Sequence, residues 1–215
     1  MGSQEGDTTA MDSLLIGTPC EVVAALARAL GASFAPIPSL ADEAAFERWR
    51  ASASDEASHE RVVVAAWSPQ PAPAPLLELD DSDWQQRGED SLLVWNAALG
   101  YAIQRCRDGG SLVAVVEAPA PLDSAGWVPE AGVAEAVAAL ARSLALSEGP
   151  RGVRANTVTT PARLTTGAVV DPQPPLTNFP GQLENEVVGA VRMLLSPEAA
   201  GITGRVLAAD CGRTW

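Results

Sequence analysis

Short apolar segments alternate with stretches of helical periodicity along the chain, and this alternation constrains the fold more than any other feature. The apolar segments have the length and composition of buried strands; they lie at 13–17, 33–36, 61–66, 111–116, 153–159 and 205–209. The helical patterns between them lie at 21–30, 41–50, 84–107, 129–148 and 183–195. Strands that alternate with helices in this way predict repeated βαβ units and a parallel sheet. The expected fold class is therefore α/β.

The length of 215 residues suits one domain, and 47% hydrophobic residues can supply its core. We find no internal repeat and no linker, so residues 13–215 are expected to form a single unit. Residues 1–12 are polar and acidic and are expected to form a flexible tail. They have neither a basic segment nor an apolar one, so they do not read as a secretory signal.

The charge and the rare residue types exclude several classes of function. The net charge of −13 would be repelled by nucleic acid and by anionic membranes. Every basic residue is arginine; the absence of lysine excludes an intrachain Schiff base and a P-loop, and a single histidine excludes a two-histidine metal site. Three dispersed cysteines and no membrane-length apolar run favour a cytoplasmic protein without a metal site. The Arg-rich, Lys-free composition suggests a bacterial source.

Three segments resemble the short-chain dehydrogenase/reductase family. ARSLALSEGPRGVRANTV (141–158) is similar to the helix and strand that follow the active site in that family. GITGRVLAADCG (201–212) is similar to its C-terminal motif, and residues 77–117 are similar to its long interface helix with the strand that follows. The resemblance covers about residues 13–212 and implies a Rossmann-type doubly wound sheet that binds NAD(P).

The resemblance also implies a catalytic Tyr, Lys, Ser and Asn, and none of these is found at the matching positions. Glu130 stands at the Tyr position, Ala134 at the Lys position and Ser91 at the Asn position. The Ser position falls at Ala118 or the adjacent Glu117. A positioned general acid or base typically accelerates a reaction by roughly 10² to 10⁴-fold. Ordinary carbonyl reduction is therefore expected to be impaired, and no catalytic residue is assigned.

The cofactor loop of the family is eroded as well. Its glycine-rich turn is replaced by Gly17, Thr18, Pro19, Cys20 and Glu21. Pro19 removes an amide donor, and Glu21 places negative charge where phosphates would lie. The family's N-N-A-G motif after its fourth strand is replaced by Ala65, Ala66, Trp67 and Ser68. Trp67 either fills adenine or ribose space or lies partly exposed in a loop. We therefore expect no cofactor, and NAD(P) only if the chain is an active enzyme.

The interval between residues 36 and 61 has room for one helix only, whereas the family has a helix, a strand and another helix there. The sheet is therefore expected to lack about one β-α unit in its first half.

Simple structural roles are expected for the other candidate residues. Asp80, Asp81 and Asp83 are interpreted as a helix cap. Glu117 and Asp123 are read as surface carboxylates, and Glu130 as a solvated glutamate at a helix start. His59 is read as solvated, Arg142 and Arg154 as members of local ion pairs, and Asn156 as a structural residue.

Three functions stay open. The leading hypothesis is a non-catalytic subunit that assembles with an intact member of the family, through helices 84–107 and 129–148, and stabilises or regulates it; homo-oligomer formation through the same helices is the other possibility. The alternative is a divergent oxidoreductase that uses Glu130 or Glu117, with residues 160–182 as a substrate lid. A small-molecule-binding module is the third reading.

Overall fold

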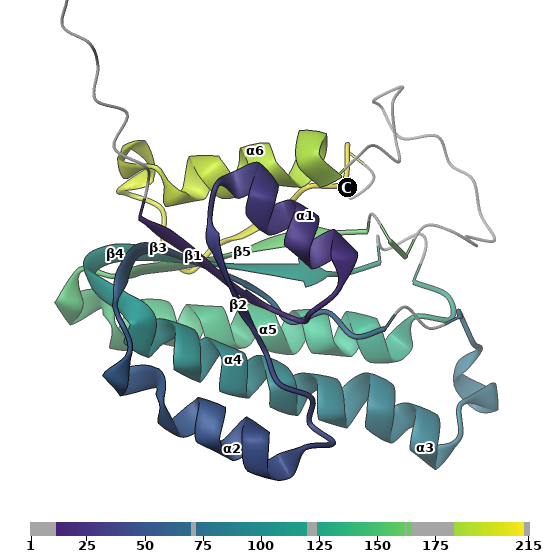
Figure 1. The fold of residues 1–215 in the computed structure, drawn as a ribbon. Coiled ribbons are helices and arrows are strands. Elements are labelled where there is room, and N and C mark those ends of the chain that lie inside the picture. Colours follow the sequence, from purple (N-terminus) through teal and green to yellow (C-terminus); the bar gives the residue numbers. More distant parts are fainter. Residues whose placement is uncertain (1–11, 70–71, 120–123, 162, 165–182, 213–215) are drawn as a thin grey trace, which may run out of the picture.

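The computed structural model describes residues 12–69, 72–119, 124–161, 163–164 and 183–212. Within these residues a single parallel sheet has the order β2-β1-β3-β4-β5-β6 (Figure 1), which confirms the predicted fold class. Its strands are β1 (Ser13–Gly17), β2 (Ser33–Pro36), β3 (His59–Ala65), β4 (Cys106–Glu117), β5 (Arg154–Thr160) and β6 (Val206–Ala208).

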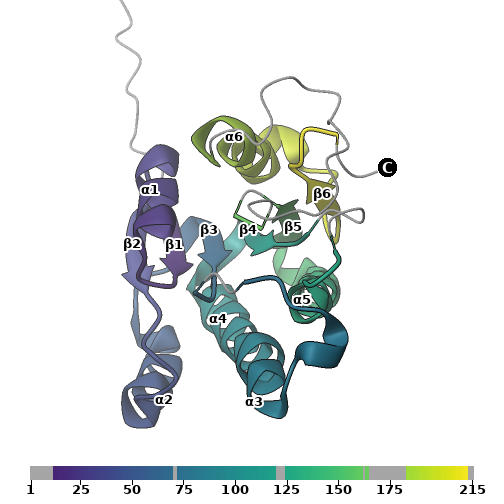
Figure 2. The ribbon, with the colours of Figure 1, turned by 90° about the vertical axis from the view of Figure 1, so that its right-hand side faces the viewer.

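Helices cover both faces of this sheet. They are α1 (Glu21–Leu30), α2 (Glu43–Ala51), α3 (Asp81–Trp84), α4 (Ser91–Arg105), α5 (Val128–Ser147) and α6 (Leu183–Leu195). Figure 2 shows α1 and α6 on one face and α4 and α5 on the other, with α2 beside α4. Coverage on both faces explains why the central strands are continuously apolar rather than alternating.

The core lies in the strands next to the centre of the sheet. Val62, Val63 and Val64 of β3 and Leu112 and Val113 of β4 have no exposed surface. Full burial of each such side chain contributes roughly 1.5–3 kcal/mol before the cost of ordering the chain. The rigid centre of the sheet fixes the positions of the loops that leave its carboxyl edge.

The helix predicted at 84–107 is divided in the structure. α3 is capped by Asp80, whose carboxylate accepts the backbone N–H of Asp83 at 2.8 Å, as the capping interpretation predicted. A π-helical segment, Gln85–Asp90, joins α3 to α4. α4 then ends at Arg105, and β4 begins at once with Cys106. Wider π turns inside helices are frequent at functional sites.

The first half of the sheet is shortened as predicted. The structure describes every residue between β2 and β3. These residues form only α2 and a 3₁₀ turn, Ala53–Asp55, and no further strand. β2 is consequently an edge strand. In the part of the chain that the structure describes, no helix is long and apolar enough to cross a membrane.

Candidate functional site

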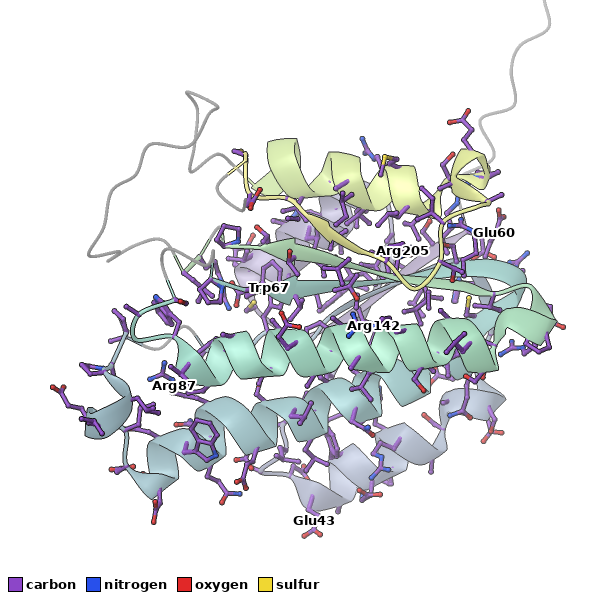
Figure 3. All side chains as sticks on the ribbon, turned by 180° about the vertical axis from the view of Figure 1, so that it is seen from behind. Glu43, Glu60, Trp67, Arg87, Arg142 and Arg205 are labelled. Carbon is purple, nitrogen blue, oxygen red and sulfur yellow. The ribbon has the colours of Figure 1, made fainter. Side chains whose placement is uncertain are left out.

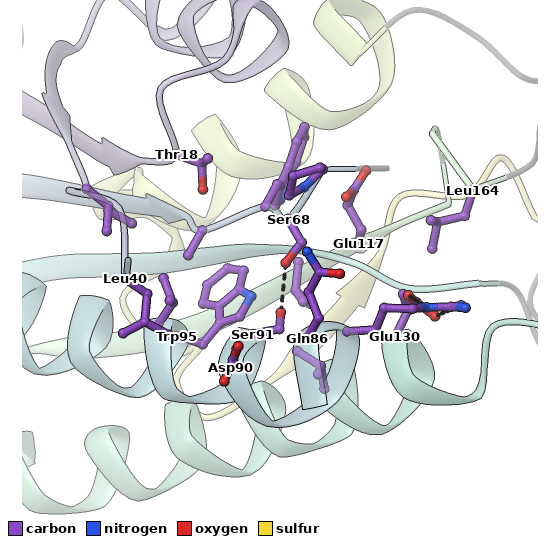
Figure 4. Close-up of a pocket in the computed structure, with 18 of the residues that line it drawn as sticks. Thr18, Leu40, Ser68, Gln86, Asp90, Ser91, Trp95, Glu117, Glu130 and Leu164 are labelled. Carbon is purple, nitrogen blue, oxygen red and sulfur yellow. Dashed lines mark hydrogen bonds and ion pairs between the residues drawn. The ribbon is translucent and has the colours of Figure 1, made fainter. Parts of the chain in front are cut away.

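A crevice of about 720 Å³ opens at the carboxyl ends of β1, β3 and β4. The chain leaves β1 toward β2 on one side and later returns through β3 on the other, so this is the switch point of the sheet. Ligands of open α/β sheets bind at such points. The loop after β1, residues 37–40 after β2, residues 66–69 after β3 and the start of α4 line it (Figure 4).

The loop after β1 has one glycine, Gly17, and leads directly into α1. A Cβ on Gly17 would lie 2.5 Å from Val23 Cγ1 and 2.9 Å from the Ala65 oxygen, so packing alone requires this glycine. Cys20, the N-cap of α1, makes no side-chain cap bond, so within the described part of the chain no side chain caps the first amides of α1. Glu21 extends along the helix to Arg28 at 2.7 Å rather than over these amides.

Trp67 forms a buried wall of the crevice. Its side chain is 3% exposed, and its Nε1 donates to the Val115 oxygen at 2.7 Å. The prediction that Trp67 lies partly exposed in a loop is therefore wrong. The guanidinium of Arg163 stacks over the ring at 5.2 Å, a cation–π geometry.

Glu117, the last residue of β4, has a side chain that is only 12% exposed, so the prediction of a surface carboxylate is wrong. Both of its carboxylate oxygens accept from Arg163, which also donates to the Ser68 oxygen at 2.9 Å. Burial raises the pKa of Glu117 above its ordinary value. The bonds and charge of Arg163 oppose this rise, and the nearby charge of Glu130 adds to it.

Glu130, in the first turn of α5, forms a second ion pair of the same type. Arg87 from the π-helical segment donates to both of its oxygens at 2.8 Å and to the Gly126 oxygen at 3.1 Å. Arg87 also lies over the ring of Trp127 at 5.9 Å. The Glu130 side chain is 14% exposed, so the prediction of a solvated glutamate is wrong. Figure 3 shows Arg87 and Trp67 toward the same end of the molecule.

The four positions matched to the family's catalytic residues do not all reach the crevice. Ser91 lines it, and its hydroxyl lies 3.1 Å from that of Ser68 (Figure 4). Glu130 also lines it, whereas Ala118 and Ala134 do not. The single tyrosine, Tyr101, instead donates to Glu56 at 2.7 Å outside the crevice.

Three other sequence interpretations are tested by the structure. His59 is not solvated: its Nδ1 lies 2.6 Å from Asp12, and its Nε2 faces Arg105. Arg154 forms no ion pair among the described residues, which corrects the prediction, and donates instead to the backbone oxygens of Leu194, at 2.8 Å, and Ser196. Asn156 is structural as predicted, because it donates to the Ile202 oxygen and accepts from a backbone N–H.

Sequence reasoning missed the two arginines that hold the glutamates. Arg163 follows β5 without any local pattern, and Arg87 lies in a polar stretch that resembles an exposed helix start. It also missed that Asp83 and Asp90 line the crevice. Asp123 and most of the predicted lid, 165–182, lie outside the described residues. Among the described residues, no cluster of His, Cys, Asp and Glu could hold a metal ion.

Comparisons with known proteins agree with this architecture. A family model described as Enoyl-(Acyl carrier protein) reductase matches residues 14–214. The chain belongs to the short-chain dehydrogenase/reductase family. A short-chain dehydrogenase/reductase from Serratia marcescens is 19% identical with a TM-score of 0.67, and the alignment covers 95% of this chain and 98% of that chain. No curated protein matches the chain.

Two similar structures hold a cofactor. BdcA in complex with NADPH is 20% identical over 94% of each chain, with a TM-score of 0.69. A blue fluorescent protein from a metagenomic library, also in complex with NADPH, is 18% identical with a TM-score of 0.61; the alignment covers 95% of this chain and 99% of that chain. These complexes contradict the expectation of no cofactor. That expectation rested on the loop after β1 and on Trp67, whereas a dinucleotide in this fold binds in the crevice at the switch point of the sheet.

Proposed function

We propose that the chain is an NAD(P)(H)-dependent oxidoreductase with an altered active site. The open crevice at the switch point of the sheet carries this proposal. Its volume of about 720 Å³ lies within the usual range for cofactor sites, roughly 300–1,000 Å³. Family membership and the NADPH complexes of similar structures support it.

The residues at the crevice fit a dinucleotide. The first amides of α1 have no side-chain cap, and the positive end of this helix favours phosphate oxygens. Thr18 and Pro19 lie beside them on the crevice wall. The side chain of Glu21, 84% exposed and paired with Arg28, does not occupy this position. A dinucleotide would therefore be held mainly by backbone amides rather than by cationic side chains.

The chain's own residues shape the rest of the site. Trp67, Leu164 and Trp95 form apolar walls that exclude water from a bound substrate. The paired hydroxyls of Ser68 and Ser91 offer a donor and an acceptor for a polar substrate atom. The bound cofactor supplies or accepts a hydride in this class of reaction.

Titration of the purified chain with NADPH and NADH by calorimetry tests the proposal. Thr18→Glu places a carboxylate beside the α1 amides and is expected to weaken binding at least about tenfold. Ser54→Glu makes the same charge change on an exposed turn outside the crevice and is expected to leave the affinity unchanged. Lack of saturable binding by the unmodified chain, or equal effects of the two variants, would refute the proposal.

A second proposal is the non-catalytic subunit that assembles with an intact member of the family. It is supported by the exposed apolar side chains of the two long helices: Leu93 of α4 is 48% exposed and Leu146 of α5 is 82% exposed. A stable homo-oligomer through the same surface would bury these side chains equally well.

Affinity purification from the native host, with the native mass of the complex and mass spectrometry, separates these assemblies. The second proposal requires a stoichiometric short-chain dehydrogenase/reductase whose activity or stability changes when this chain is added. Leu146→Asp should abolish the assembly. Leu77→Asp, at a position that is 98% exposed but lies outside α4 and α5, should not. Elution of the chain only with itself would refute this proposal.

A further inference from the structure

Reduction of a carbonyl consumes a hydride and a proton, and the described crevice offers no group committed to donating that proton. The chain has no lysine, and Tyr101 lies outside the crevice in contact with Glu56 and Arg105. Glu117 and Glu130 each accept two hydrogen bonds from an arginine, so both oxygens of each carboxyl group are already engaged. Burial raises the pKa of Glu117, and the bonds from Arg163 oppose that rise. A substrate that already carries its proton would not need such a donor.

The charges on the crevice wall favour a cation. Arg87 and Arg163 are each matched by a glutamate. Asp83 and Asp90 also line the crevice, and neither forms an ion pair with an arginine of the described residues. Asp90 accepts only a side-chain amide bond from Gln85, at 3.2 Å. With all carboxyls ionised the wall therefore carries an excess of negative charge beside the start of α4.

The remaining surface of the crevice is largely apolar. Leu40, Val94, Trp95, Val116 and Leu164 contribute to it, and Trp95 is fully buried. Figure 4 shows Leu40 and Trp95 close to Asp90 and Ser91 at one end of the cavity. A ligand that matches both features has an apolar body and one cationic centre.

We infer that the crevice takes an apolar imine in its protonated, iminium form, a substrate class that rests on the proposed oxidoreductase function. The iminium carbon accepts a hydride and forms a C–H bond, and the electron pair of the C=N π bond becomes the lone pair on nitrogen. The product is a neutral amine, which takes a proton from water after release. The hydride and its two electrons come from the reduced nicotinamide dinucleotide, which is thereby oxidised. No proton leaves the protein.

Binding of an amine product and its neutral analogue tests this without turnover. Tetrahydroisoquinoline is protonated at neutral pH, whereas tetralin has the same ring skeleton and no charge. Each is titrated into the chain with NADP⁺ present, by calorimetry and by tryptophan fluorescence, because Trp67 and Trp95 line the crevice. We expect the amine to bind at least about fivefold more tightly than tetralin.

Two charge-neutralising variants locate the effect. Asp90→Asn is expected to remove most of the preference for the amine. Glu89→Gln, on the same π-helical segment but exposed and outside the crevice, is expected to keep it. The wild-type preference should also fall as the pH rises above the pKa of the amine, a readout that does not depend on any variant folding. Equal affinities for amine and tetralin at neutral pH would overturn the inference.

Turnover distinguishes failure of the inference from failure of the proposed function. Dihydroisoquinoline is expected to be reduced faster than tetralone, at a rate that falls as the imine loses its proton. Faster reduction of tetralone than of dihydroisoquinoline would overturn the iminium assignment but not the proposed oxidoreductase function. It would also point to Glu117 as a proton donor. Absence of NADPH and NADH binding would instead overturn the proposed function on which the inference rests.

Discussion

Replacement of Arg163 by methionine is expected to destabilise the fold around the crevice. The Arg163 and Glu117 side chains are only 16% and 12% exposed, and the arginine also stacks on Trp67. Loss of one partner from a buried ion pair costs about 3–5 kcal/mol. Because both side chains retain some contact with water, we expect Arg163→Met to lower the free energy of unfolding by about 3 kcal/mol, near the lower end of this range. In a chain of this length that corresponds to roughly 6–12 °C in Tm.

The loss should depend on pH. Burial already raises the pKa of Glu117, and Arg163 acts against this rise, so the pKa rises further in Arg163→Met. A carboxyl whose pKa is raised in the folded state binds its proton more tightly there than in the unfolded chain. The destabilisation is therefore largest above the folded-state pKa of Glu117 and shrinks as the pH falls toward the ordinary value of 4.5.

Urea unfolding followed by tryptophan fluorescence, at about pH 5 and about pH 8, measures this difference. The double variant Arg163→Met, Glu117→Gln should recover most of the loss at the higher pH, because no buried charge is left. Arg142→Met, at an exposed position on α5, is the matched control and should stay within about 0.5 kcal/mol of wild type. A loss of equal size at both pH values would refute the reasoning.

Three further predictions follow from the described geometry. Gly17→Ala should lower the free energy of unfolding in urea by about 2–4 kcal/mol, because the new Cβ would meet Val23 and the Ala65 oxygen. Gly100→Ala on α4 has open space and should raise it by about 0.5–1 kcal/mol; the reverse order would contradict this reasoning. Burial raises the pKa of the Cys106 thiol to about 11, so iodoacetamide at about pH 8 should not modify it until the chain unfolds. Carbamidomethylation of Cys106 before unfolding, seen in peptide maps, would count against its burial. Burial and Arg105 lower the pKa of His59 below 6.5, so stability should fall as the pH drops through that value, and His59→Gln should flatten this part of the pH–stability curve; an unchanged curve would disprove the assignment.

The fold could be predicted from the sequence because burial on both faces leaves an unambiguous pattern. The runs at 61–66 and 111–116 are apolar throughout, and both are central strands in the structure. The spacing between 36 and 61 likewise limited the first half of the sheet to one helix. The break at 85–90 was not predictable, because a π turn changes hydrogen bonding without changing the apolar pattern around it.

The site was predictable only in part. Family resemblance brought attention to Ser91, Glu117 and Glu130, and all three line the crevice. Their environments could not be predicted, because Arg163 lies 46 residues from Glu117 and Arg87 lies 43 residues from Glu130. A glutamate looks the same in sequence whether water or an arginine surrounds it; tertiary packing decides its burial and pKa. The lost glycines suggested a lost cofactor, but the crevice depends on the order of the strands.

Amide hydrogen exchange with and without NADPH is the measurement that tests the central claim most directly. We predict saturable protection of segments 66–69 and 91–95, which contribute residues to the crevice wall, and of the amides at the start of α1, which follow the lining residues Thr18 and Pro19. Thr18→Glu should reduce that protection at the same NADPH concentration. No saturable protection, or protection confined to elements away from the carboxyl edge of the sheet, would contradict it.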